Sequence, residues 1–189
     1  MSNGDRRAVL EATNGTYYQV PVLIHDGRAV CESSPASTDI ARYIDRIFGA
    51  GRLFPSDLEG LQRIILPHIE NEVEGTTFRL VDPLYLRDIA DPIERGLIRR
   101  HKERRFGQGC IERWEQDRET LLARTTDLLE PFDLMLQQRH FLLGTSPVFA
   151  DFALFGILGN LTFRGYNKIP EPFVHLTEWF ERLRAFRYC

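Results

Sequence analysis

The spacing of apolar residues along this 189-residue chain changes once, and that change limits the folds open to it. Two short β-rich runs come first, at residues 17–24 and 29–31, and Asp26-Gly27 between them is typical of a hairpin turn. From Ser37 onward the apolar residues recur at helical spacing as far as the C-terminus. The sequence therefore predicts a hairpin and one helix, followed by a region built only of helices.

The boundary between the two regions lies in a segment rich in glycine and proline. Ile40, Ile44 and Ile47 predict a helix, and Gly49 stands where its C-terminal cap is expected. Residues 49–55 are interpreted as a linker. We therefore predict two domains, at residues 1–50 and 56–189, with a further short helix over residues 6–14.

The second region carries several helix-start signals. Ser56 and Asp57 are expected to cap its first helix, and the Asp-Pro pairs at 82–83 and 91–92 each predict a new helix start. Residues 149–163 are apolar nearly all round, which predicts a buried central helix.

Composition excludes several classes of protein. Hydrophobic residues make up 43% of the chain, yet no run approaches the roughly 18 apolar residues that a membrane helix needs. The net charge of −3 does not favour a nucleic-acid partner. The three cysteines are odd in number and far apart, which favours reduced thiols over disulfides or a zinc site. We expect a cytoplasmic protein with no nucleic-acid partner, no membrane partner and no metal.

The basic residues have one local concentration. Only two of the 24 lysines and arginines are lysines, which we attribute to GC-rich codons, and we expect a bacterial source. The run from Arg99 to Arg105 is interpreted as a solvated helix surface, with an anionic ligand or partner as the alternative. Cys110 is expected to be buried and unreactive, although a basic run beside it leaves open a depressed thiol pKa.

Several short motifs occur in a fixed order along nearly the whole chain. They are Val20-Pro21-Val22-Leu23, Asp26-Gly27, Glu32-Ser33, Asp39-Ile40-Ala41-Arg42-Tyr43-Ile44, Leu53-Phe54-Pro55, Phe141-Leu142-Leu143-Gly144 and Phe149-Ala150-Asp151-Phe152. In this order they resemble the glutathione transferase family. The resemblance implies an α+β fold, with a truncated thioredoxin-like N-terminal domain followed by an all-α helical-bundle C-terminal domain. Glutathione is then the expected ligand or substrate.

The resemblance also implies where glutathione binds. The Val20-Pro21 bond is expected to be cis, which turns the backbone of Val20 toward the cysteinyl part of glutathione. Glu32 and Ser33 resemble the acid–serine pair that holds the γ-glutamyl end. The alternatives are a trans proline that merely opens a strand, and a serine N-cap beside a solvated glutamate.

The register of the acid–serine pair depends on the side from which it is counted. Counting from Gly27 gives Glu32 and Ser33, whereas counting back from Ile40 gives Ser37 as the serine. Both counts hold only if about one helical turn is inserted between them. Pro35 favours an insertion that loops outward, and we therefore favour Glu32 and Ser33 over Ser37.

The chain departs from the family pattern at two other places. The residues before Val20 are too few for the family's opening strand–helix–strand, so the activating Tyr, Ser or Cys is expected to be missing and the catalytic residue is unknown. Tyr17 and Tyr18 do not stand in the activating motif. Val148 replaces the usual Ser or Thr of the capping box, and Asp151 is interpreted as structural.

Two functions follow from the resemblance. The first is conjugation of the glutathione thiol to a small electrophile, provided that the missing segment is restored. The alternative is a non-catalytic module that binds glutathione or another protein. A homodimer is also implied.

Overall fold

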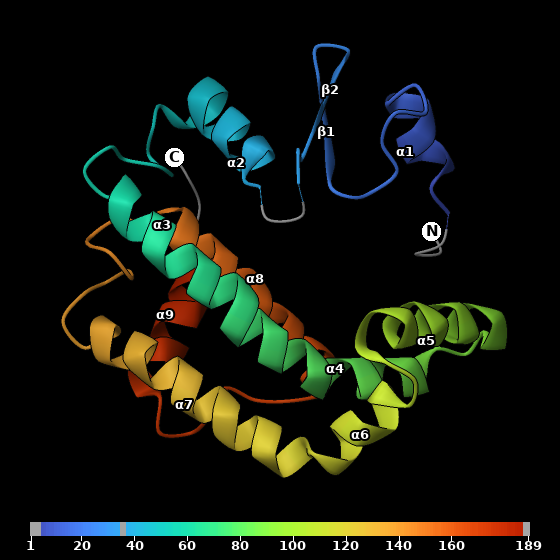
Figure 1. Cartoon of the computed structure of the whole chain (residues 1–189). Coiled ribbons are helices and arrows are strands. Elements are labelled where there is room, and N and C mark those ends of the chain that lie inside the picture. Colours follow the sequence, from blue (N-terminus) through green and yellow to red (C-terminus); the bar gives the residue numbers. More distant parts are fainter. Residues whose placement is uncertain (1–4, 35–36, 187–189) are drawn as a thin grey trace. The chain divides into compact units, whose positions relative to one another are not determined.

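The computed structural model describes residues 5–34 and 37–186, which divide into two compact units, Met1–Ser56 and Asp57–Cys189. Figure 1 labels the principal elements. The first unit contains α1 (Arg7–Ala12), β1 (Val22–His25), β2 (Arg28–Cys31), α2 (Asp39–Ile44) and the π-helical turn η1 (Asp45–Gly49). The second contains α3 (Glu59–Pro67), η2 (His68–Val73), α4 (Glu74–Asp88), α5 (Pro92–Phe106), α6 (Cys110–Gln116), α7 (Arg118–Leu136), α8 (Phe149–Leu161), η3 (Phe163–Gly165) and α9 (Val174–Ala185).

The predicted hairpin is confirmed. β1 and β2 pair antiparallel in a register that joins Val22 to Cys31 and His25 to Arg28. Asp26 and Gly27 form the turn, and both have positive φ, at 49° and 73°. A two-residue hairpin turn needs this left-handed backbone, which Asp tolerates and Gly adopts freely. The Val20-Pro21 bond directly before β1 is cis, as the sequence predicts.

A buried carboxylate connects α2 to the chain that follows it. Asp45 is almost fully buried, and its two oxygens accept hydrogen bonds from the backbone N–H groups of Leu53 (2.9 Å) and Phe54 (3.0 Å). The left-handed residue that ends the helical turn is Ala50, at φ 51°, so the prediction that Gly49 is the cap is wrong. Gly49 is instead the residue whose Cβ would come within 2.3 Å of Asp45 Oδ1.

Replacing Gly49 with alanine is therefore expected to destabilise the first unit. The new Cβ would push against a carboxylate that two hydrogen bonds hold in place, at a cost of about 1–3 kcal/mol. The matched control is Gly96→Ala, in the middle of α5, where nothing lies within 4 Å of the added Cβ. That change should stabilise its helix by roughly 0.5–1 kcal/mol. Urea unfolding of the two variants measures the difference, and equal effects would contradict the account of Gly49.

The core of the second unit is built around α8, as the apolar sequence of residues 149–163 predicts. Leu154, Leu158 and Leu161 of α8 are buried, and α3, α4 and α9 all pack against this helix. In Figure 1, α3 and α4 run alongside α8. Trp179 on α9 is fully buried.

Buried polar side chains form hydrogen bonds around the start of α8. Asp151 accepts hydrogen bonds from the backbone N–H groups of Leu142 (2.9 Å) and Val148 (3.0 Å) and from Trp179 Nε1 (2.9 Å). Burial raises the pKa of Asp151, and these hydrogen bonds oppose the shift only in part. The prediction that Asp151 is structural is confirmed. Gln62 on α3 similarly accepts a hydrogen bond from the Ala150 N–H, at 3.0 Å.

Two of the predicted helix starts are wrong. α3 begins at Glu59, after Leu58 and not after Ser56 or Asp57. Pro83 lies inside α4 and does not begin a helix. A proline inside a helix costs about 3 kcal/mol. Burial of Leu80, Val81 and Leu86 on both sides of it stabilises the continuous helix by about 1.5–3 kcal/mol for each side chain.

The third predicted start is confirmed. Pro92 opens α5, and the side chain of Asp91 accepts a hydrogen bond from the Ile93 N–H at 2.9 Å.

Candidate functional site

Four polar residues meet where α2 begins, and we call Glu32, Ser33, Ser37 and Asp39 the α2 cluster. The Glu32 carboxylate accepts hydrogen bonds from the backbone N–H of Asp39 (2.8 Å) and from that of Ile40 (3.3 Å). The Ser37 hydroxyl also donates to Glu32. Glu32 thus accepts hydrogen bonds from backbone N–H groups that have no partner within the first turn of α2. This is the position in a helix that attracts a carboxylate.

Asp39 completes the cluster from the opposite direction. Its carboxylate accepts a hydrogen bond from the Ser33 N–H at 2.8 Å. Hydrogen bonding by the Ser33 side chain lowers the pKa of Asp39, and the Ser33 N–H lowers it further. Asp39 is therefore ionised at neutral pH, and two carboxylates lie in one small cluster. This arrangement attracts a cationic group, whereas the serine hydroxyls already bond the two carboxylates and must turn away from them to donate to an anionic group.

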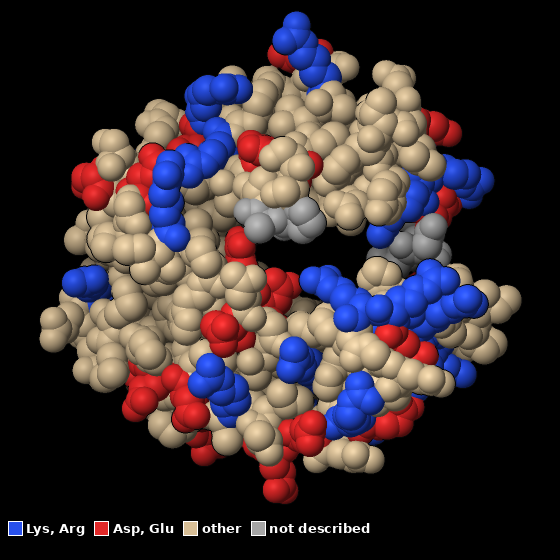
Figure 2. Space-filling model, in the orientation of Figure 1, with Lys and Arg blue, Asp and Glu red and all other residues tan. Residues whose placement is uncertain are grey.

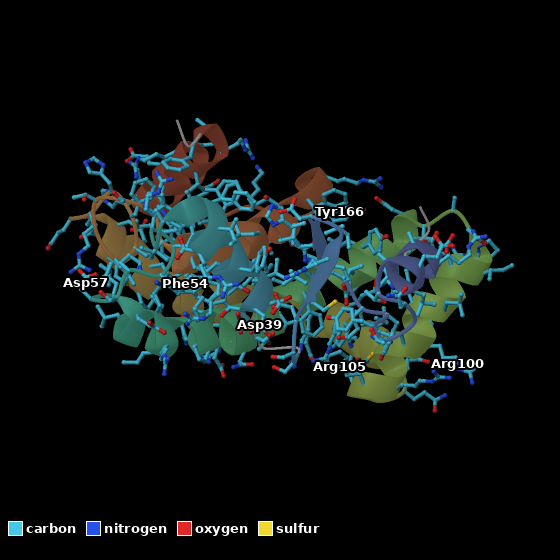
Figure 3. The ribbon with its side chains drawn as sticks, turned by 90° about the horizontal axis from the view of Figure 1, so that it is seen from above. Asp39, Phe54, Asp57, Arg100, Arg105 and Tyr166 are labelled. Atoms are coloured by element: carbon cyan, nitrogen blue, oxygen red, sulfur yellow. The ribbon has the colours of Figure 1, made fainter. Side chains whose placement is uncertain are left out.

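The hairpin register places Val20-Pro21 and the α2 cluster at the same end of the two strands. Val22 pairs with Cys31 at the open end of the hairpin, so Pro21 and Glu32 are the next residues beyond that pair. Val20 is 55% exposed, and Pro21 and Ser33 are also exposed. Figure 3 labels Asp39 at the start of α2. The backbone of Val20 and the cluster together form the candidate site.

The structure brings together residues that the sequence treats as alternatives. Ser37 and Glu32 are hydrogen-bonded, so the residue counted from Ile40 and the residue counted from Gly27 lie in one cluster. The helix starts at Asp39 and does not extend back to Ser37. Pro35, which favoured Glu32 and Ser33 over Ser37, lies outside the described residues. Asp39 was not predicted as a site residue, although an acid at the first position of a helix was a usable signal for it.

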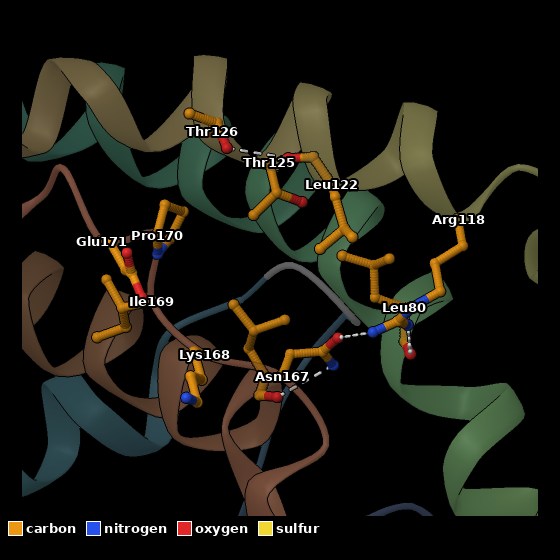
Figure 4. Close-up of a pocket in the computed structure, with 11 residues that line it drawn as sticks. Leu80, Arg118, Leu122, Thr125, Thr126, Asn167, Lys168, Ile169, Pro170 and Glu171 are labelled. Atoms are coloured by element: carbon orange, nitrogen blue, oxygen red, sulfur yellow. Dashed lines mark hydrogen bonds between the residues drawn. The ribbon is translucent and has the colours of Figure 1, made fainter.

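Two of the cavities in the described part of the second unit lie close together. One, of about 280 Å³, lies between α7 and the segment after α8, and Figure 4 shows its lining. The other, of about 320 Å³, lies beside α4. Leu80 and Arg118 line both. The Arg118 guanidinium donates a 2.7 Å hydrogen bond to Asn167 Oδ1, which holds it between α4 and residue 167.

The surroundings of Cys110 decide between the two states of its thiol that the sequence left open. Cys110 is fully buried, and burial raises the pKa of its thiol, so the alternative of a depressed pKa is wrong.

In residues 5–34 and 37–186 no three His, Cys, Asp or Glu side chains gather in a way that could hold a metal ion. Within the same ranges, no helix is long and apolar enough to cross a membrane.

A hairpin-and-helix unit followed by an all-helical unit defines an α+β protein. Two family models identify its family. The model described as "Glutathione S-transferase, C-terminal domain" matches residues 83–185, and "Glutathione S-transferase, N-terminal domain" matches residues 1–52. The chain belongs to the glutathione S-transferase family.

Two solved structures share this fold. Glutathione transferase GSTFuA3 from Phanerochaete chrysosporium aligns with a TM-score of 0.74 and 17% identity, over 100% of this chain and 82% of that one. Glutathione S-transferase 1-6 from Anopheles dirus species B aligns with a TM-score of 0.61 and 16% identity, over 95% of this chain and 71% of that one. At these identities the likeness extends to the fold alone.

Proposed function

We propose that this protein binds glutathione through the α2 cluster and the backbone of Val20. The observation that carries the proposal is the meeting of Glu32, Ser33, Ser37 and Asp39 at the end of the hairpin where Val20 is exposed. Membership of the glutathione S-transferase family supports glutathione as the ligand.

Each part of glutathione has a complementary group in this proposal. The ammonium of the γ-glutamyl end lies near the carboxylates of Glu32 and Asp39. Its carboxylate accepts hydrogen bonds from the hydroxyls of Ser33 and Ser37, which turn from the Asp39 and Glu32 carboxylates to donate to it. The cysteinyl backbone pairs with Val20. Pro21 shapes the approach but has no N–H to donate.

The proposed reaction is attack of the glutathione thiolate on a small electrophile. The sulfur forms a bond to the electrophilic carbon, the leaving group departs with the electron pair, and the thiol proton passes to solvent. A free thiol has a pKa of about 8.5, so a donor must stabilise the thiolate for this to proceed at neutral pH. We propose that a side-chain donor beside the thiol supplies this stabilisation, and that the protein works as a cytoplasmic homodimer.

One observation favours a second candidate function. The Glu32 carboxylate is already bonded to α2 and the Asp39 carboxylate to Ser33, so the cluster also serves to close the loop between β2 and α2. A non-catalytic protein that binds glutathione or another protein on this scaffold would keep this structural role without conjugation.

Two parallel measurements on the same protein separate these functions. Calorimetric titration reports glutathione binding, and absorbance reports conjugation of glutathione to an activated aryl chloride above the uncatalysed rate. Binding with conjugation supports the transferase, and binding without it supports the non-catalytic alternative. Absence of heat at millimolar glutathione, with no conjugation, would contradict the proposal.

A further inference from the structure

Helix α5 has one face that anchors it to the second unit. Lys102 Nζ lies 2.5 Å from Asp82 Oδ2 on α4, and Arg99 forms an ion pair with Glu112 on α6. The ring of Phe106 packs edge-on against Trp114, with 5.4 Å between their centroids. Because these contacts lie on the inner face, changes on the outer face should leave the helix in place.

The outer face of α5 has an unusual composition for a solvated surface. Ile93 and Leu97 are 71% and 61% exposed, and Arg100 and Arg104 continue the same row toward the C-terminus. The spacings of four, three and four residues place all four side chains on one stripe. Neither Arg100 nor Arg104 forms an ion pair or hydrogen bond within the described part of the chain. We call these four residues the α5 stripe.

The charge on α5 is opposite to that of the whole protein. The helix carries six cationic side chains and two carboxylates, in a chain whose net charge is −3. Figure 2 shows Lys and Arg side chains gathered in a band over α5, and Figure 3 labels Arg100 on this helix. The surface is therefore cationic at one end of the stripe and aliphatic at the other.

We propose that the α5 stripe docks the protein on the surface of an anionic phospholipid bilayer. A bilayer presents phosphate groups and hydrocarbon within one interface, so it complements the arginines and the aliphatic pair together. Arginine can reach the phosphates while its stem lies along the apolar layer. A nucleic acid supplies the phosphates but leaves Ile93 and Leu97 without an apolar partner. This docking is peripheral and requires no membrane-spanning helix. It therefore departs from the expectation of no membrane partner, which rested on the lack of a spanning apolar run.

Co-sedimentation with vesicles tests the electrostatic half of the proposal. The full chain is mixed with phosphatidylcholine vesicles or with vesicles containing about a third phosphatidylserine. Each arginine near such a surface contributes about 1 kcal/mol, or roughly fivefold in affinity, so Arg100→Glu with Arg104→Glu should weaken binding at least ~25-fold. The matched control is Arg28→Glu with Arg139→Glu, two exposed arginines outside α5. It changes the net charge equally and should leave binding within about twofold.

A second pair of variants tests the apolar half. Ile93→Ser with Leu97→Ser should weaken binding by at least about tenfold, because two aliphatic side chains no longer enter the interface. The control is Leu134→Ser with Val174→Ser, whose parent side chains are 55% and 56% exposed on other helices. Far-UV circular dichroism of every variant confirms that the helices are retained.

The expected result is binding that requires phosphatidylserine, weakens as salt rises, and falls only in the two α5 variants. Equal binding to both vesicle types, no binding to either, or equal losses in the control variants would overturn the proposal. A parallel titration with duplex DNA supplies one more outcome. Tight DNA binding that Arg100→Glu with Arg104→Glu abolishes, and that Ile93→Ser with Leu97→Ser leaves intact, would assign the stripe to nucleic acid and overturn membrane docking.

Discussion

Replacing Asp151 with alanine is expected to lower the free energy of unfolding by at least ~3 kcal/mol, because three buried donors lose their acceptor together. Each unsatisfied donor costs about 1–3 kcal/mol, and the truncated side chain also leaves a cavity. Typical domains have only 5–15 kcal/mol in total, so this variant should be close to unfolded in moderate urea. Urea unfolding followed by fluorescence measures the loss, since Trp179 is one of the three donors.

The isosteric variant Asp151→Asn provides the control. Its amide oxygen can keep the hydrogen bonds from Leu142 and Trp179, while its NH₂ group faces the N–H of Val148 and loses that one. Burial disfavours the ionised form of Asp151, so the neutral amide also avoids part of the desolvation cost. We expect Asp151→Asn to lose about 1–2 kcal/mol, clearly less than the alanine variant. Equal losses, or a loss below 1 kcal/mol for alanine, would contradict the structural role of this carboxylate.

The second large effect is expected at Glu32. If its carboxylate holds the ammonium of glutathione, Glu32→Ala removes a charge-assisted hydrogen bond worth on the order of 1.5–3 kcal/mol. That corresponds to a loss of affinity of roughly tenfold or more. Isothermal titration calorimetry of wild type and variant with glutathione measures it directly.

Three further variants make the result at Glu32 specific. Glu11→Ala removes an exposed carboxylate from α1 and should leave affinity unchanged. Ser33→Ala and Ser37→Ala each remove one hydroxyl of the α2 cluster and should weaken binding by less than Glu32→Ala. A thermal melt of Glu32→Ala checks that the first unit remains folded, since Glu32 also bonds the start of α2. An effect confined to Ser37→Ala would show that the acid of the pair had been assigned wrongly.

The parts of the fold that could be predicted from the sequence are those fixed by local chemistry. The Asp26-Gly27 turn needs left-handed backbone, and Asp91-Pro92 pairs a capping side chain with a residue that lacks an N–H. Pro83 was misassigned because the packing of side chains distant in sequence decided its environment. Ser56 and Asp57 were misassigned because one more residue, Leu58, follows them before α3 starts at Glu59.

The candidate site shows the same division. Glu32, Ser33 and Ser37 could be proposed from the order of residues around the hairpin and helix. Its position at the start of a helix was a signal for Asp39, but its contact with the Ser33 N–H could not be predicted, because that contact depends on how the intervening loop closes. Asp45 was missed for a similar reason, since its hydrogen-bond donors, Leu53 and Phe54, lie eight and nine residues further along the chain. Spacing alone does not specify such closures.

The central claim is that the α2 cluster recognises the γ-glutamyl end of glutathione. Calorimetric titration of the wild-type protein with glutathione and with cysteinylglycine, which lacks the γ-glutamyl group, tests that claim most directly. We expect glutathione to bind at least about tenfold more tightly, because only glutathione can place its ammonium beside Glu32 and Asp39 and its carboxylate beside the serines. Equal affinity for the two peptides, or no binding of glutathione at all, would contradict this assignment of the site.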